Sequence, residues 1–315
     1  MKIIVKQFIW ILCLCSAVAC TRENIEQCDT PNVALTFSNA FAPAPAPASK
    51  AILADEIHSL DVFVFDHSGL CLLHQRDDKG PFAASYVMLL HLLPDVYTCV
   101  AWANLNQKDY YLSGDENKAP FVVGQSYQKE AMIHIQNQQG VVSTDLASLF
   151  HGQTTQLLVE YNPNDLYRRD IPMIKDVNTI NIKLEHVGSV IQGAELKVEL
   201  DGHNGHMHFD NSLNTTMPGV VYRPYLATAG TDFVVDVMRL RTGLPLMMRV
   251  VNPITGATVL SEDLTKLIIE TGQVTNDEGF DRLDTYNVVI SFGTNVDATI
   301  TINGWLVKQP ESDLE

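Results

Sequence analysis

The chain has little positive charge. Of its 315 residues, 21 are Lys or Arg and 37 are Asp or Glu, so the formal net charge at pH 7 is −16. A protein this acidic has no general attraction for nucleic-acid phosphates or for anionic lipid headgroups, because like charges repel. The sequence therefore predicts no nucleic-acid partner, and it predicts that any attachment to a membrane does not depend on surface charge.

Motifs of catalysis and metal binding are missing as well. The sequence contains no G-x-S-x-G, H-E-x-x-H, phosphate-loop or dinucleotide-binding glycine motif, and no C-x-x-C pair. Three imidazoles lie close together at His203, His206 and His208. They are candidate metal ligands, and the alternative is a set of polar residues on the rim of a hairpin. We expect no enzyme activity and no metal cofactor.

Long apolar runs are absent beyond the first twenty residues, which predicts that the mature chain does not span a bilayer. At the start, Lys2 and Lys6 form a short basic region before an apolar run from Phe8 to Leu14, and small residues follow this run. That run is too short to cross a membrane, and the pattern is typical of a secretory signal peptide. We assign residues 1–19 to this signal.

The small residues end in Ala17-Val18-Ala19-Cys20, which resembles a bacterial lipobox. We expect cleavage before Cys20 and modification of this cysteine with N-acyl and S-diacylglycerol lipid. Because two or more acyl chains hold a protein stably in a membrane, residues 20–31 would then form a lipidated tail. The alternative is ordinary secretion with cleavage after Ala19.

Cysteines are few. The chain has six, and four remain after residue 19: Cys20, Cys28, Cys71 and Cys99. With Cys20 lipidated, at most one disulfide can form within the chain. Cys71 and Cys99 both lie in runs typical of strands, so they are either a possible disulfide or two buried free thiols.

Alternation of apolar and polar residues at period two recurs along the chain and predicts strands with one buried face. It is clear at residues 178–185, 194–200 and 297–303, whereas Leu60–Phe65 and Val96–Trp102 are apolar on both faces and are expected at the centre of the first domain. Helical spacing is limited to two short segments, Asp145–His151 and Glu262–Glu270. The sequence therefore predicts an all-β protein of antiparallel sandwiches with one or two short helices.

Two stretches interrupt the strand pattern. The Ala-Pro run at residues 42–48 favours an extended linker, and it separates a first strand at Val33–Phe37 from the body. A polar stretch at residues 162–176 is the expected domain junction. We predict one β-sandwich domain over residues 32–165 and a second over residues 166–315.

Several segments together resemble one family, the anchor subunits of Bacteroidales fimbriae (type V pili). The matching segments are Cys20–Cys28, Val33–Phe37, Val62–Asp66, Leu92–Tyr97, Ala101–Asn104, Asp145–Gly152, Leu283–Tyr286 and Gly304–Trp305. The chain departs from the family pattern at Asp95, where glycine is usual. The resemblance implies two tandem transthyretin-like antiparallel β-sandwich domains and a lipid anchor in the cell outer membrane.

The resemblance also implies partners and a mode of assembly. Stalk subunits of such fimbriae lose their first strand to a protease, usually after Arg, and accept a strand from a neighbour in the emptied groove. Anchor subunits retain theirs, and here the only Lys or Arg between Glu23 and Gln75 is Lys50. We therefore expect Val33, Leu35 and Phe37 to fill the protein's own groove. The predicted partners are fimbrial stalk or accessory subunits, joined by strand exchange.

A different function remains open from the sequence. A surface lipoprotein or a tip adhesin that binds glycan or host protein would share this fold. The two hypotheses differ in what the purified protein binds: the anchor co-purifies with a fimbrial stalk, whereas the adhesin binds its ligand alone.

Overall fold

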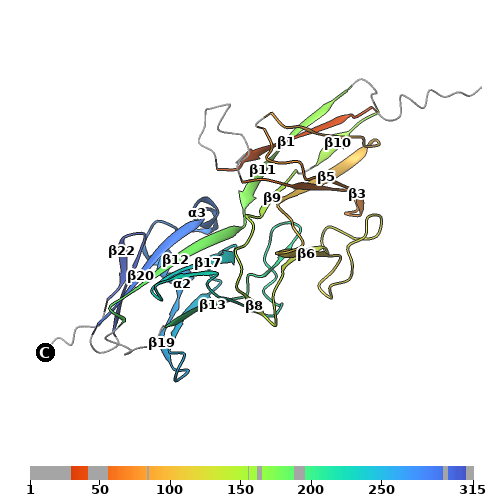
Figure 1. The fold of residues 1–315 in the computed structure, drawn as a ribbon. Coiled ribbons are helices and arrows are strands. Elements are labelled where there is room, and N and C mark those ends of the chain that lie inside the picture. Colours follow the sequence, from red (N-terminus) through yellow and green to blue (C-terminus); the bar gives the residue numbers. More distant parts are fainter. Residues whose placement is uncertain are drawn as a thin grey trace, which may run out of the picture.

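The structure is a computed structural model that describes residues 30–41, 56–83, 85–154, 156–161, 165–187, 196–293 and 297–309. Cys20, Cys28, the Ala-Pro run and Lys50 lie outside these ranges. Figure 1 shows an elongated molecule in which the first half of the chain and the second half form two lobes.

One sheet of eight strands forms most of the first lobe. Its strands are β1 (Val33–Asn39), β2 (Leu60–Phe65), β3 (Cys71–Asp77), β4 (Met88–Leu90), β5 (Asp95–Ala103), β9 (Phe150–Gln153), β10 (Leu157–Val159) and β11 (Tyr167–Lys175). The order is β3-β2-β5-β9-β11-β1-β4, and β10 pairs with β5 beside this path. Strands from both ends of this order contribute to one apolar cluster, so the sheet curves around its own core.

The second lobe is a sandwich of two sheets. The first has the order β16-β17-β12-β20-β21-β22, with β12 (Val177–Glu185), β16 (Leu226–Thr228), β17 (Asp232–Met238), β20 (Thr285–Phe292), β21 (Ala298–Ile302) and β22 (Trp305–Lys308). The second has the order β19-β18-β13-β15-β8, with β8 (Val141–Val142), β13 (Lys197–Gly202), β15 (Val220–Tyr222), β18 (Leu246–Val251) and β19 (Thr258–Asp263). The all-β prediction is confirmed.

The two lobes share strands across the predicted boundary. A small sheet joins β6 (Tyr110–Ser113) and β7 (Met132–Ile135) from the first half to β14 (His206–His208) from the second, and β8 pairs with β15. Sheet membership along the main path changes at Asp176, between β11 and β12. The change of sheet therefore falls at the end of the predicted junction at residues 162–176, after β11, whereas the predicted domain limits at residues 165 and 166 lie before β11. The division into two domains itself stays a prediction.

The core consists of two clusters on opposite faces of the central strands. In β2, Val62 and Val64 pack into one cluster, and Phe63 and Phe65 pack into the other. Successive side chains of a strand point to opposite faces, so a strand apolar at every position is buried on both. The prediction that Leu60–Phe65 lies centrally is confirmed.

Of the two predicted helices, one is confirmed. Helix α2 covers Leu264–Glu270, and the side chain of Asp263 accepts a hydrogen bond from the backbone of Lys266 at its start. A second helix, α3, covers Asp277–Arg282 and was not predicted. The structure describes no helix of sufficient length and apolar character to cross a membrane among the residues it covers.

The predicted helix at Asp145–His151 is wrong. Its backbone groups bond to distant side chains instead: the N–H of Leu146 donates to Asp236 at 3.1 Å and that of Ala147 to Asp109 at 3.1 Å. The hydroxyl of Tyr110 donates to the carbonyl of Ala147. These tertiary bonds satisfy groups that a helix would have paired internally, and the chain continues directly into β9.

Candidate assembly site at the first strand

Strand β1 lies inside the first sheet and has a neighbour on each side. It pairs in parallel with β11 over seven residues, from Val33 opposite Tyr167 to Asn39 opposite Met173. On its other side it pairs antiparallel with β4 over three residues. Because β1 and β11 are far apart in sequence, their parallel pairing does not depend on a short connection between them. A strand from a separate chain can make the same backbone hydrogen bonds.

The apolar side chains of β1 fill the core of the first lobe. Val33, Leu35 and Phe37 belong to the same buried cluster, in which Val33 and Leu35 have no exposed surface and Phe37 is 5% exposed. Their period-two spacing places all three on one face of the strand, as the sequence predicted. Their assignment as groove-filling residues stays a prediction, which we develop as a proposal below.

The opposite face of β1 carries two hydroxyl groups that bond to one carboxylate. The hydroxyl of Thr36 donates to Asp170 Oδ1 at 3.0 Å, and the hydroxyl of Ser38 donates to Asp170 Oδ2 at 2.5 Å. Asp170 belongs to β11, so these bonds add to the backbone pairing of the same two strands. Hydrogen bonds to a charged acceptor are stronger than those between neutral groups. The register of β1 against β11 is thus fixed on both faces.

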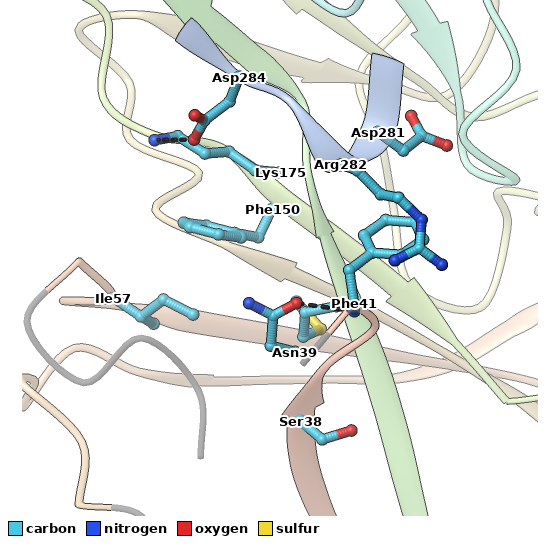
Figure 2. A pocket seen from close by; sticks show the side chains of 10 residues that line it. Ser38, Asn39, Phe41, Ile57, Phe150, Lys175, Asp281, Arg282 and Asp284 are labelled. Carbon is cyan, nitrogen blue, oxygen red and sulfur yellow. Dashed lines mark hydrogen bonds and ion pairs between the residues drawn. The ribbon is translucent and has the colours of Figure 1, made fainter. Parts of the chain in front are cut away.

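Where β1 ends, the two lobes meet around a small cavity of about 180 Å³. The apolar part of its lining comes from Ile57, Phe150 and Met173, and the charged part comes from Lys175, Asp281, Arg282 and Asp284. Figure 2 shows the ring of Phe41 beside the guanidinium of Arg282, and Lys175 pointing to Asp284. Residues from both ends of the chain therefore line one junction.

Lys175 forms two ion pairs on one side of this junction. Its ammonium lies 3.0 Å from Asp284 and 3.2 Å from Glu56. Burial disfavours its charge, but the hydrogen bond and charge of Asp284, supplemented by Glu56, outweigh burial and raise the pKa of Lys175. Lys175 stays protonated and links the segment after the Ala-Pro run to the second lobe.

A buried ionic cluster lies at the residue that joins the two sheets. Asp176 is fully buried and accepts a hydrogen bond from Asn211 at 3.0 Å, and its carboxylate is 3.5 Å from Arg239. The guanidinium of Arg239 forms a bidentate pair with Asp281, which Arg241 also contacts at 2.8 Å. Burial raises the pKa of Asp176 to about 7 against the opposing effect of Arg239. This cluster ties the junction to α3.

The two cysteines of the described chain are free and buried. Cys71 packs in the cluster that contains Phe65, and Cys99 packs in the cluster that contains Val64. Because they face opposite sides of one sheet, the disulfide considered from the sequence is not formed, and the alternative of buried free thiols is the correct one. Burial raises the pKa of each thiol to about 12, which disfavours the reactive thiolate form at neutral pH.

The three histidines that were considered as metal ligands have different surroundings in the structure. His203 is exposed and contacts the carbonyl of Met217 at 3.1 Å, and His206 is buried. His208 lies on β14 with a buried Nδ1 that has no hydrogen-bond partner within the described residues. No group of three metal-binding side chains occurs in the part of the chain that the structure covers.

A histidine that the sequence analysis missed is the actual partner of His206. His134 on β7 lies opposite His206 in the β7–β14 pair, and their Nδ1 atoms are 2.9 Å apart. The hydroxyl of Ser113 donates to the carbonyl of Asp115 at 2.7 Å, so it accepts from His134 Nε2, also at 2.7 Å. His134 Nδ1 then accepts from His206. Burial lowers the pKa of His134 to about 3, and it lowers that of His206.

Solved structures with similar folds include proteins from Bacteroides and Porphyromonas. A candidate polysaccharide-binding protein from Bacteroides thetaiotaomicron matches with a TM-score of 0.74 and 18% identity, covering 91% of this chain and 100% of that one. A candidate adhesin from Bacteroides ovatus matches with a TM-score of 0.72 and 18% identity, covering 89% and 95%. The fimbrial anchor protein Mfa2 from Porphyromonas gingivalis matches with a TM-score of 0.69 and 15% identity, covering 88% and 99%.

The comparison with curated proteins found no match. The comparison with protein-family models found one that extends over nearly the whole chain. The model of the fimbrillin-A associated anchor proteins Mfa1 and Mfa2 matches residues 26–310, which include β1, both lobes and the junction between them. This chain therefore belongs to the family of fimbrillin-A associated anchor proteins.

Proposed function

We propose that this protein is a lipid-anchored subunit that attaches a fimbria to the outer membrane, and that its own first strand prevents elongation on that side. The family is one of fimbrial anchor proteins and not of enzymes. The observation that carries the proposal is the position of β1 between β4 and β11, with Val33, Leu35 and Phe37 buried.

A donor strand needs a free sheet edge and empty side-chain pockets. Strand addition derives its affinity from main-chain hydrogen bonds, and alternate side chains provide specificity. Here β1 occupies the edges of both β4 and β11, and its own side chains fill the pockets. A neighbouring subunit therefore finds no groove at this position, and growth of the fibre stops there.

Retention of β1 follows from the composition of the chain around it. Lys50 is the only Lys or Arg between Glu23 and Gln75. A protease that cuts after Arg has no target that would detach β1 from the lobe it fills. Sequencing of the amino terminus of the surface protein is expected to find a start at Cys20, or a blocked terminus. A start at Ala51 would overturn this part of the proposal.

Attachment to the membrane is assigned to lipid on Cys20. The net charge of −16 excludes electrostatic adhesion to anionic lipid, so the acyl chains supply the affinity. Metabolic labelling with a radioactive fatty acid is expected to label the parent protein. Cys20→Ala is expected to lose the label and to release the protein from the membrane fraction.

The matched control for this labelling experiment is Cys28→Ala, which removes the neighbouring cysteine and leaves the lipobox intact. It is expected to keep both the label and the membrane location. Label that persists in Cys20→Ala would refute lipidation at this residue.

Association with a fibre is tested by co-purification. The full-length protein is expected to co-purify with a fimbrial stalk polymer from the surface of cells that produce both. Binding of a glycan by the isolated protein, with no stalk present in the purified material, would favour the adhesin function instead.

A further inference from the structure

The chain that leaves β1 turns directly toward the second lobe. The backbone N–H of Ala40 donates to the carbonyl of Met173 at 3.0 Å, which extends the pairing with β11 by one residue beyond the strand. The side chain of Asn39 accepts a hydrogen bond from the backbone N–H of Phe41 at 2.8 Å. The turn is therefore defined, and it presents the ring of Phe41 to the junction shown in Figure 2.

In that junction a cation of the second lobe covers the ring. The guanidinium carbon of Arg282 lies 4.7 Å from the centroid of the Phe41 ring, within the range of a cation–π contact. Arg282 is the last residue of α3, and Glu278 on the same helix holds its guanidinium at 2.6 and 3.0 Å. The ion pair with Glu278 therefore holds the guanidinium of Arg282 in position for its contact with Phe41.

The chain re-enters the described structure beside the same helix. Glu56 pairs with Lys175, and Lys175 pairs with Asp284, two residues after Arg282. Lys175 is only 21% exposed, so this bridge is less screened by water than a surface pair. Phe41 and Glu56 flank residues 42–55, and both are therefore connected to the end of α3. Phe41 contacts Arg282, and Glu56 is linked through Lys175 to Asp284.

We propose that Phe41 and Arg282 form a latch that fastens the end of the first strand to the second lobe, so that β1 stays in its groove even when the chain between Phe41 and Glu56 is cut. This inference rests on the proposed role of β1 as a retained strand, and it deepens that role. Retention then depends on contacts as well as on a continuous chain, and the second lobe takes part in closing the groove of the first.

The experiment cuts the chain and measures how fast the strand leaves. A recognition sequence for a site-specific protease replaces residues 43–49, and the purified full-length protein is cleaved. A fluorescent peptide covering residues 30–41 is added in excess, and its incorporation reports loss of the original strand. The cleaved parent is expected to retain its own amino-terminal fragment through size-exclusion chromatography.

Two substitutions remove the latch from opposite sides. In the cleaved protein, Phe41→Ala and Arg282→Gln are each expected to speed exchange by about two- to thirtyfold, the range of a cation–π contact from exposed to desolvated sites. The double variant is expected to exchange no faster than the faster single variant, because both changes remove one contact. The matched control is Arg223→Gln, whose partner Glu199 also lies in the second lobe, and it is expected to exchange like the parent.

Folding of each variant is checked first on uncleaved protein by thermal unfolding. If Phe41→Ala fails to fold, Arg282→Gln carries the test, because this side chain is half exposed. Equal exchange rates in the parent, Arg282→Gln and Arg223→Gln would overturn the latch, as would loss of the fragment from the cleaved parent during chromatography. Neither outcome bears on lipidation of Cys20 or on co-purification with a fibre, so failure of the latch is distinguishable from failure of the proposed function.

Discussion

β1 and β12 each lie between two neighbouring strands of a sheet, but the lengths of their backbone pairings differ. β1 pairs in parallel with β11, and β12 pairs in parallel with β20, each over seven residues. On the other side, β12 pairs with β17 over seven residues, whereas β1 pairs with β4 over only three. β12 also follows β11 after a single residue, Asp176, so it is continuous with the strand before it.

Under the proposed function, this difference predicts that β1 is easier to exchange than β12. Each ladder hydrogen bond contributes about 0.5–1.5 kcal/mol, so a strand with one short neighbour is held less firmly by its backbone than a strand with two long ones. β1 compensates with the bonds of Thr36 and Ser38 to Asp170 and with the contact of Phe41 with Arg282. Under the proposed function, these side-chain contacts from both lobes keep the groove of β1 closed.

The largest effect is expected at the junction between the two strands. Arg239→Met leaves the buried carboxylate of Asp176 without its cation and leaves Asp281 paired with Arg241 alone, and breaking a buried ion pair in this way costs about 3–5 kcal/mol. Urea unfolding followed by circular dichroism measures this loss. Arg223→Met, which removes half of an exposed pair, is expected to cost about 1 kcal/mol or less. Equal losses in the two variants would show that the junction is not a stabilising centre.

A pair of core truncations compares the two strands directly. Leu35→Ala in β1 and Ile182→Ala in β12 each remove a fully buried side chain and are each expected to cost about 2–5 kcal/mol. Only Leu35→Ala is expected to increase incorporation of an added peptide of residues 30–41, because that peptide replaces β1 and not β12. Equal incorporation in the two variants would remove the distinction between the strands.

Acidification is expected to lower the free energy of unfolding through the buried pair of His134 and His206. The pKa of His134 is about 3 in the folded protein and 6.5 for a free histidine, so the unfolded state binds more protons below pH 6.5. The contribution of His134 to the free energy of unfolding is therefore fully present above pH 6.5, and it is lost as the pH falls toward 3. Between pH 7 and pH 5 the parent is expected to lose about 1–2 kcal/mol more than His134→Gln. Parallel curves of unfolding free energy against pH would contradict the assignment.

The smallest effect is expected from reduction. Since Cys71 and Cys99 are free thiols on opposite faces of the sheet, a reducing agent is expected to leave the melting temperature unchanged. Both thiols are expected to react with a thiol reagent only after unfolding, because burial raises their pKa to about 12. A fall in melting temperature on reduction would indicate a disulfide.

Much of the local structure was predictable because it depends on neighbours in sequence. The period-two pattern at residues 178–185 predicted a strand that the structure has as β12. The runs at Leu60–Phe65 and Val96–Trp102 predicted two central strands, which are β2 and β5. The first strand was expected at Val33–Phe37 and extends to Asn39. The helical pattern at Glu262–Glu270 was correct, whereas that at Asp145–His151 was overridden by side chains of Asp109 and Asp236.

The sequence by itself determined the all-β class, the strand periods and the presence of a first strand set apart by an Ala-Pro run, since these depend on side-chain polarity and backbone preference over a few residues. Only the tertiary structure decided that β1 pairs in parallel with a strand more than 130 residues away, that Cys71 and Cys99 face different cores, and that His206 meets His134. The physical reason is that pairing between distant strands depends on how whole sheets fold together, and no local pattern of residues encodes that arrangement.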